Sequence, residues 1–121
     1  MPGYVDGFVL PVPKKKMKAY LAIARKAARV WKDHGALEYR ECVADDIKAK
    51  GPVSYARSVK LKAGETVLFS WIVYKSRAHR DRVIAKVMKD PRLAKMMEPG
   101  APQPFDYKRM LYAGFKIAVD R

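Results

Sequence analysis

Three residues in one short segment have side chains suited to binding or turning over a ligand: Arg77, His79 and Arg80. On a helix, Arg80 would share the apolar side that faces a sheet, with Arg77 nearby on the same side. That side is set by residues three, four and seven positions after Arg80, namely Val83, Ile84 and Val87. An inward guanidinium in the first turn of a helix could bind an anion with help from the helix N-terminus.

A structural role for Arg80 is the alternative, and we prefer it. The side chain would then extend along apolar surface to solvent, or pair with a buried carboxylate. The candidate carboxylates are Asp6, Glu38 and Glu41.

The chain has two histidines, His34 and His79, and neither has a carboxylate at metal-ligand spacing. Either histidine could act as a general base. The simpler interpretations are a local hydrogen bond for His79 and a favourable position at a helix C-terminus for His34. Cys42 is the only cysteine, and it has no histidine or lysine pattern nearby to activate it. No glycine-rich phosphate-binding pattern occurs. We therefore expect no metal site and no cofactor.

Aromatic residues in the predicted strands could line a pocket for an aromatic molecule. They are Tyr39, Trp71, Tyr74 and Tyr112. The competing interpretation is that they fill the core or an interface, which is the commoner use of aromatic residues at alternating strand positions.

The net charge of +14 and the isoelectric point near 10.0 favour acidic partners. Basic residues follow the outer side of the first predicted helix and the loop from Lys48 to Lys62. A nucleic-acid-associated protein is therefore one alternative. It is not the preferred one, because the aromatic residues lie in strands and are not interleaved with the basic residues as a base-stacking surface requires.

The pattern of apolar residues predicts four strands and two main helices. Alternation every second residue indicates strands, and recurrence every three or four residues indicates helices. The predicted strands span 4–12, 37–46, 66–74 and 108–119, and the helices span 14–34 and 76–89 with a further turn at 92–97. Residues 47–64 are expected to form a loop with a short piece of strand near 59–61, and residues 98–104 an irregular segment.

This order predicts a single domain over residues 1–121 of the α+β class. We expect a ferredoxin-like βαββαβ fold, with a four-stranded antiparallel sheet and both helices on one face. The 66–74 strand is apolar on both sides, whereas helices can cover only one face. A homodimer that packs sheet to sheet would cover the other face. A groove for another protein or a large ligand is the alternative.

Five stretches of the sequence resemble the YbaA-like family of small bacterial proteins, a domain of unknown function. They are Tyr4-Val5-Asp6-Gly7-Phe8-Val9, His34-Gly35-Ala36-Leu37-Glu38-Tyr39-Arg40-Glu41-Cys42, Phe69-Ser70-Trp71-Ile72-Val73-Tyr74, Ser76-Arg77-Ala78-His79-Arg80-Asp81 and Asp90-Pro91-Arg92-Leu93. The resemblance implies a place in the dimeric α+β barrel superfamily. It implies no activity, because the family has none firmly assigned, and membership of the wider superfamily adds none because function does not follow from fold.

The expected function is the binding or turnover of a small anionic or aromatic molecule by a homodimer. Arg80 would position an acid group, and Trp71 or Tyr39 would shape the pocket. The sequence leaves open whether the protein is an enzyme, and a structural or stress-associated dimer without a ligand is a further alternative. The N-terminus has no leader pattern and no apolar run spans a membrane, so a cytoplasmic location is expected.

Overall fold

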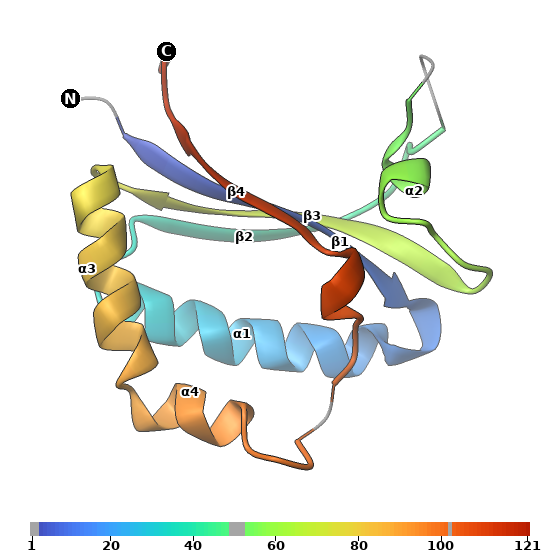
Figure 1. The fold of residues 1–121 in the computed structure, drawn as a ribbon, viewed down its shortest axis with the longest axis horizontal. Helices are drawn as coiled ribbons and strands as arrows, with labels where there is room; N and C mark the ends of the chain where they lie inside the picture. Colours follow the sequence, from blue (N-terminus) through green and yellow to red (C-terminus); the bar gives the residue numbers. More distant parts are fainter. Residues whose placement is uncertain (1–2, 49–52, 102) are drawn as a thin grey trace.

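The computed structural model describes residues 3–48, 53–101 and 103–121. A four-stranded antiparallel sheet in the order β2-β3-β1-β4 forms one layer, and helices α1, α3 and α4 form the other (Figure 1). The strands are β1 (Tyr4–Pro13), β2 (Glu38–Val43), β3 (Glu65–Tyr74) and β4 (Leu111–Lys116). The helices are α1 (Met17–Asp33), α2 (Tyr55–Ser58), α3 (Arg77–Met88) and α4 (Pro91–Met96), with single 3-10 turns η1 (Lys14–Lys16) and η2 (Tyr107–Arg109). The predicted ferredoxin-like arrangement is confirmed.

Local sequence explains where the helices begin and end. Ser76 accepts a hydrogen bond from the backbone N–H of His79 and so caps α3, as its residue type predicts. Asp90 caps α4 in the same way, with Pro91 at the first helical position. Gly35 adopts a φ of 114°, a left-handed conformation that favours glycine, directly after α1.

Two predicted elements differ from the structure. The short strand expected near residues 59–61 is wrong, because α2 and its C-terminal turn occupy this part of the described chain. The last strand is six residues long instead of spanning 108–119. Its start is delayed because Asp106 accepts a hydrogen bond from the backbone N–H of Lys108, which holds residues 107–109 in η2.

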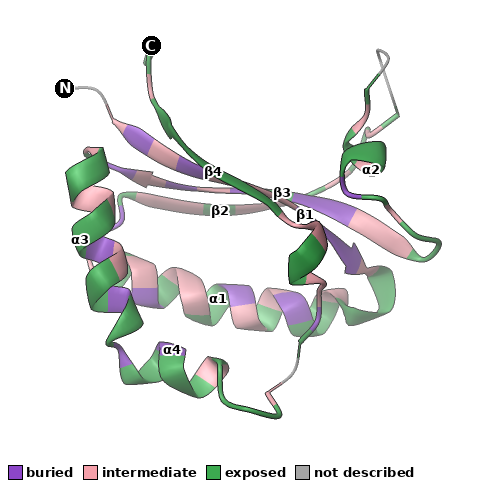
Figure 2. Ribbon diagram, in the orientation of Figure 1, coloured by how far each residue is buried: buried purple, intermediate pink, exposed green. Residues whose placement is uncertain are grey.

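The two faces of the sheet differ in their cover. The buried residues lie mainly between the sheet and α1, α3 and α4, whereas β4 is exposed along its length (Figure 2). The opposite side, here called the outer face, is partly covered by α2 at one end, where Tyr55 packs near Phe69. The remaining outer face keeps large apolar side chains exposed, among them Phe69 and Leu111 at 45% and Phe115 at 55%. The prediction that the 66–74 strand carries apolar side chains on both faces is confirmed, with Leu68 and Ile72 buried under the helices and Phe69 on the outer face.

Candidate functional site

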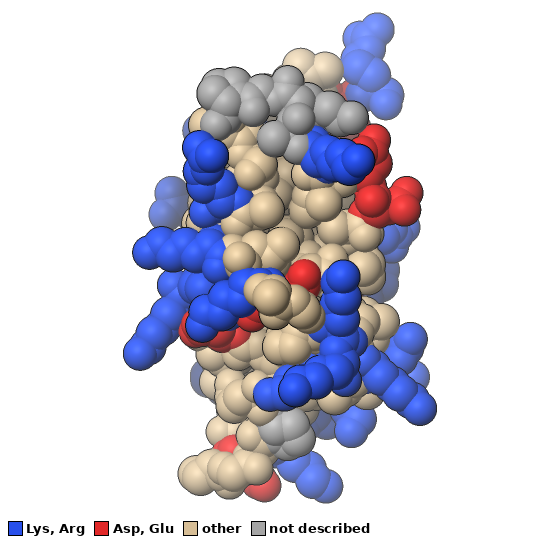
Figure 3. Space-filling view, turned by 90° about the vertical axis from the view of Figure 1, so that its right-hand side faces the viewer, with Lys and Arg blue, Asp and Glu red and all other residues tan. Residues whose placement is uncertain are grey.

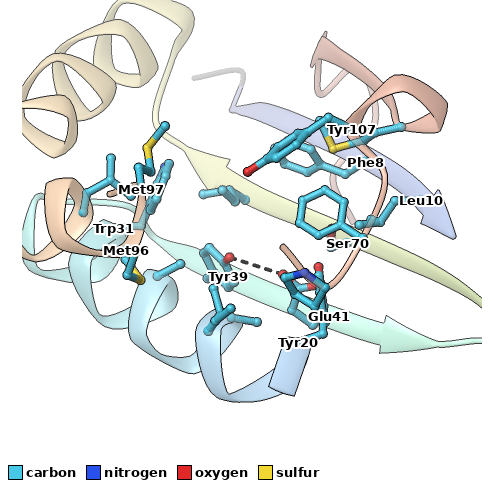
Figure 4. A pocket seen from close by; sticks show the side chains of 18 of the residues that line it. Phe8, Leu10, Tyr20, Trp31, Tyr39, Glu41, Ser70, Met96, Met97 and Tyr107 are labelled. Carbon is cyan, nitrogen blue, oxygen red and sulfur yellow. Dashed lines mark hydrogen bonds between the residues drawn. The ribbon is translucent and has the colours of Figure 1, made fainter. Parts of the chain in front are cut away.

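A cavity of about 430 Å³ lies between the helix-covered face of the sheet, α1, α4 and residues 103–110 (Figure 4). Its walls are mostly apolar, and the polar lining residues include Arg40, Glu41, Ser70 and Gln103. The aromatic lining residues are Phe8, Tyr20, Trp31, Tyr39, Phe105 and Tyr107, and the methionines are Met88, Met96, Met97 and Met110. The cavity therefore combines rigid aromatic surfaces with flexible thioether side chains, which adapt to ligands of different shape.

One carboxylate, that of Glu41, lines this cavity in the described part of the chain. The Tyr20 hydroxyl donates a hydrogen bond to Glu41 Oε1 at 2.8 Å, and the Tyr39 hydroxyl donates to Oε2 at 3.2 Å (Figure 4). Each carboxylate oxygen can accept a second hydrogen bond. Glu41 is thus held in place by two donors and retains capacity to accept another from a ligand.

The elements explain how these three side chains meet. Tyr39 and Glu41 are two residues apart on β2, so they project from the same face of the sheet. Tyr20 belongs to the buried stripe of α1 that packs against this face. Glu41 lies opposite Ser70 in the β2–β3 register, and the buried Ser70 also lines the cavity.

Burial raises the pKa of Glu41, and the hydrogen bonds from Tyr20 and Tyr39 oppose that shift. Burial also raises the pKa of both tyrosines, and the charge of Glu41 raises it further. Both hydroxyls therefore stay protonated at neutral pH and act as donors. A glutamate whose pKa is raised by burial is a stronger base than a glutamate in water, which suits it to accept a proton from a ligand.

Glu41→Gln should change how stability depends on pH. Because the pKa of Glu41 is raised by folding, its stabilising contribution is complete below the unfolded value and is lost as pH rises through the folded value. Glutamine does not ionise, so the variant lacks this loss. The free energy of unfolding of the variant should therefore rise relative to that of the wild type as the pH increases from 4 to 7. Urea unfolding of both proteins across this range measures the difference. If the two proteins differed in free energy of unfolding by the same amount at pH 4 and at pH 7, the burial of an ionisable Glu41 would be contradicted.

Residues 103–110 form a cover over one side of the cavity, and Arg109 fixes their position. Its guanidinium forms two hydrogen bonds of 2.7 Å with the Glu65 carboxylate at the start of β3, and its Nε contacts Asp106 at 3.0 Å. The bonds from Arg109 lower the pKa of Glu65 to about 2, so the pair is ionised at neutral pH. This cover brings Phe105 and Tyr107 over the cavity.

Arg80 pairs with Asp6, one of the three carboxylates expected for its structural role. Its Nη1 lies 2.6 Å from Asp6 Oδ1 and 3.1 Å from the Tyr112 hydroxyl, and its guanidinium stacks over the Tyr4 ring at 5.0 Å. Asp6 is 1% exposed. The guanidinium is thus already neutralised by a carboxylate, and neither residue lines the cavity.

The other predicted ligand-binding residues are scattered. Tyr39 lines the cavity, whereas Trp71 points to the outer face and donates from Nε1 to Glu38 at 3.1 Å. Of the two residues expected to shape a pocket, Trp71 or Tyr39, only Tyr39 lines this cavity. Tyr39 pairs in register with Ile72, and successive strand residues face opposite sides, so Trp71 lies on the other face.

Arg77 is exposed at the start of α3 and does not share the interior position of Arg80. His79 accepts a hydrogen bond at Nδ1 from the Lys75 backbone N–H at 2.9 Å. Burial, together with the charge of Lys75, lowers the pKa of His79, so the ring is neutral and makes the local hydrogen bond expected of it. His34 contacts Asp90 at 2.8 Å.

On the face shown in Figure 3, lysine and arginine side chains lie along both edges and across the middle, with uncharged surface and some acidic side chains between them. The basic outer side of α1 and the exposed aromatic Phe69 lie on opposite sides of the sheet.

Within residues 3–48, 53–101 and 103–121, no group of three or more histidine, cysteine or acidic residues could hold a metal ion, and no helix is long and apolar enough to cross a membrane.

Comparison with known proteins identifies relatives across nearly the whole chain. A family model described as a protein of unknown function (DUF1428) matches residues 3–107. The uncharacterized protein YbaA of Escherichia coli K12 and that of Shigella flexneri are each 45% identical over 117 residues, covering 97% of both chains.

Two solved structures share the fold. A dimeric ferredoxin-like protein from an uncultured marine organism is 13% identical with a TM-score of 0.57, covering all of both chains. A nipsnap family protein of unknown function from Agrobacterium tumefaciens is 16% identical with a TM-score of 0.53, covering 94% of this chain and 86% of that one. At these identities the likeness concerns the fold alone.

Proposed function

Because this chain belongs to the DUF1428 family of proteins of unknown function, we propose its function from the site: it binds a small, mainly apolar aromatic molecule in the cavity, with Glu41 as the polar anchor. One observation carries the proposal. Among the described residues, one carboxylate lines an aromatic and methionine-rich cavity of about 430 Å³, and two tyrosine hydroxyls hold it. Apolar walls with a few convergent polar groups are the usual composition of small-molecule sites.

The charge of the anchor decides which kind of aromatic molecule fits. A carboxylate in an apolar cavity attracts a hydrogen-bond donor or a cation and repels an anion. Arg80, the residue considered for an acidic ligand, is already paired with Asp6 outside the cavity. Arg40 also lines the cavity, but it is exposed to solvent and takes the outward position opposite Trp71 in the β2–β3 register. We therefore keep the aromatic part of the sequence-based expectation and set aside the anionic part.

A pair of fluorescent probes tests both the aromatic preference and the role of charge. N-phenyl-1-naphthylamine is neutral and has one N–H donor, and 8-anilino-1-naphthalenesulfonate adds only an anionic sulfonate to nearly the same rings. At pH 8 and 0.5 M salt, which screens the net positive charge of the protein, we expect the neutral probe to bind at least about tenfold more tightly, a difference of about 1.4 kcal/mol. Equal or tighter binding of the sulfonate would contradict an acidic anchor.

We also propose that two copies of this chain pair through the outer face. The support is the apolar surface at Phe69, Leu111 and Phe115 and the description of a fold neighbour as dimeric. Covering such a patch with a second copy removes it from water.

Phe69→Lys should convert a dimer to a monomer in sedimentation velocity, since a charge at the centre of an apolar interface weakens association by about 2 kcal/mol or more. Ala22→Lys adds the same charge on the exposed side of α1 and should leave the dimer intact. A wild-type protein that sediments as a monomer at 50 µM would rule out this interface.

A further inference from the structure

Glu41 combines three features that an anchor alone does not require. It is a carboxylate surrounded by apolar walls, it has a fixed orientation, and it has two neighbouring hydroxyl donors. A base on a flexible side chain in water lacks all three. Their combination matches the general arrangement by which a side chain removes a proton from carbon while nearby donors stabilise the resulting oxyanion.

We propose that Glu41 is a catalytic proton acceptor for a carbonyl-containing aromatic molecule whose adjacent C–H is weakly acidic, so that the protein interconverts its ketone and enol forms. This inference rests on the proposed function, because the molecule must first occupy the cavity. It adds a reaction and a substrate class to that proposal.

The geometry assigns different roles to the two tyrosines. The bond from Tyr20 to Oε1 is the shorter, at 2.8 Å, and fixes the carboxylate from the side of α1. The bond from Tyr39 to Oε2 is 3.2 Å, longer than the usual O–H···O distance, so Oε2 is the more available proton acceptor. Tyr39 is therefore also the hydroxyl that can most readily turn to a new acceptor.

The step balances without a cofactor. Glu41 Oε2 takes the proton from the carbon next to the carbonyl, the electron pair of that C–H bond forms a C=C bond, and the carbonyl π pair moves to oxygen. Protonated Glu41 is a poorer acceptor, so the Tyr39 hydroxyl can donate to the new enolate oxygen. Return of the proton from Glu41 to that oxygen gives the enol, and its return to carbon regenerates the ketone. No electrons enter or leave.

The surroundings support this chemistry. Burial raises the pKa of Glu41, which makes its conjugate base stronger, and the raised pKa of Tyr20 and Tyr39 keeps both hydroxyls protonated. The titratable groups around Glu41 are Tyr20 from α1, Tyr39 from β2 and Tyr107 from η2, with the exposed Arg40 beside the Tyr39 carbonyl. Exposed lining residues, including Met97 at 61%, mark the side from which a molecule can enter.

Deuterium exchange at the benzylic C1 position of 2-tetralone tests the inference, followed by proton NMR in D₂O. This ketone is neutral, aromatic and acidic at C1. In D₂O the proton that Glu41 takes from carbon exchanges with solvent, so that a deuteron returns to C1. The wild type should therefore accelerate exchange over buffer, and Glu41→Gln should reduce the protein-dependent rate by about 100-fold or more. Tyr39→Phe should also slow exchange, because it removes the hydroxyl that donates to the enolate oxygen. Excess N-phenyl-1-naphthylamine should return the wild-type rate to that of buffer, a test that requires no variant to fold.

The possible failures are distinguishable. Exchange no faster than in buffer, although 2-tetralone displaces the fluorescent probe, overturns the proton-transfer role and leaves the binding function standing. The proton-transfer role is likewise overturned if Glu41→Gln exchanges as fast as the wild type, or if the ketone does not displace a probe that does bind. Failure of the fluorescent probe to bind at all overturns the proposed function together with this inference.

Discussion

Replacing Arg80 with alanine is expected to lower the free energy of unfolding by about 3–5 kcal/mol, because it leaves a buried carboxylate without its counter-ion. Asp6 lies in β1 and is 1% exposed, and its ion pair with Arg80 measures 2.6 Å. The same guanidinium also bonds to the Tyr112 hydroxyl and stacks on Tyr4, so β1, β4 and α3 all lose a contact. A domain of this size has roughly 5–15 kcal/mol of stability in total, so the loss would be a large share.

The control for this experiment lies in the first turn of the same helix. Arg77 is exposed, so Arg77→Ala should change stability by no more than about 0.5 kcal/mol. Urea unfolding at pH 7 of both variants gives the comparison. The double variant Asp6→Asn with Arg80→Ala should recover part of the loss, because the unpaired charge is then gone. Similar small losses for Arg77→Ala and Arg80→Ala would contradict a structural role for the ion pair.

The strand and helix order could be predicted because it depends on local periodicity. Alternation along 66–74 and the three- and four-residue recurrence along 14–34 identify β3 and α1, and together with the caps at Ser76 and Gly35 they define the topology. Asp6 is one of three candidate carboxylate partners for Arg80 in the sequence, beside the alternatives that Arg80 extends to solvent or binds an anion. It could not be chosen from sequence, since the residues are 74 positions apart and only the sheet brings them together.

The candidate site was predicted less well. Its residue type and strand position indicate Tyr39 as a pocket residue, whereas the sequence indicates Glu41 only as a possible counter-ion for Arg80. The sequence does contain a clue to Glu41. Glu41 and Tyr39 are two residues apart on β2, so their side chains project from the same, inward face of the strand. Trp71 was grouped with Tyr39 because residue type does not reveal strand register. The cover of residues 103–110 has no periodicity, and its place depends on the contact of Arg109 with Glu65, 44 positions away.

The ligand is proposed to bind in the cavity beside Glu41. A substitution on α1 that fills this cavity tests that location. Ala27 lines the cavity, whereas Ala22 is exposed on another side of the same helix. A tryptophan at position 27 occupies space that the ligand needs, at a cost in stability of about 1–3 kcal/mol if packing is strained. A tryptophan at position 22 adds the same side chain to solvent. Circular dichroism and thermal unfolding confirm that each variant is folded before binding is compared.

The most direct measurement is the dissociation constant of N-phenyl-1-naphthylamine for the wild type, Ala27→Trp and Ala22→Trp, from fluorescence titration under one set of conditions. If the probe binds in the cavity, its affinity should be at least about 30-fold weaker for Ala27→Trp, equivalent to about 2 kcal/mol. The affinity of Ala22→Trp should equal that of the wild type. Wild-type affinity in a folded Ala27→Trp variant would contradict binding at this site, because the probe would then be bound outside the cavity that contains Glu41.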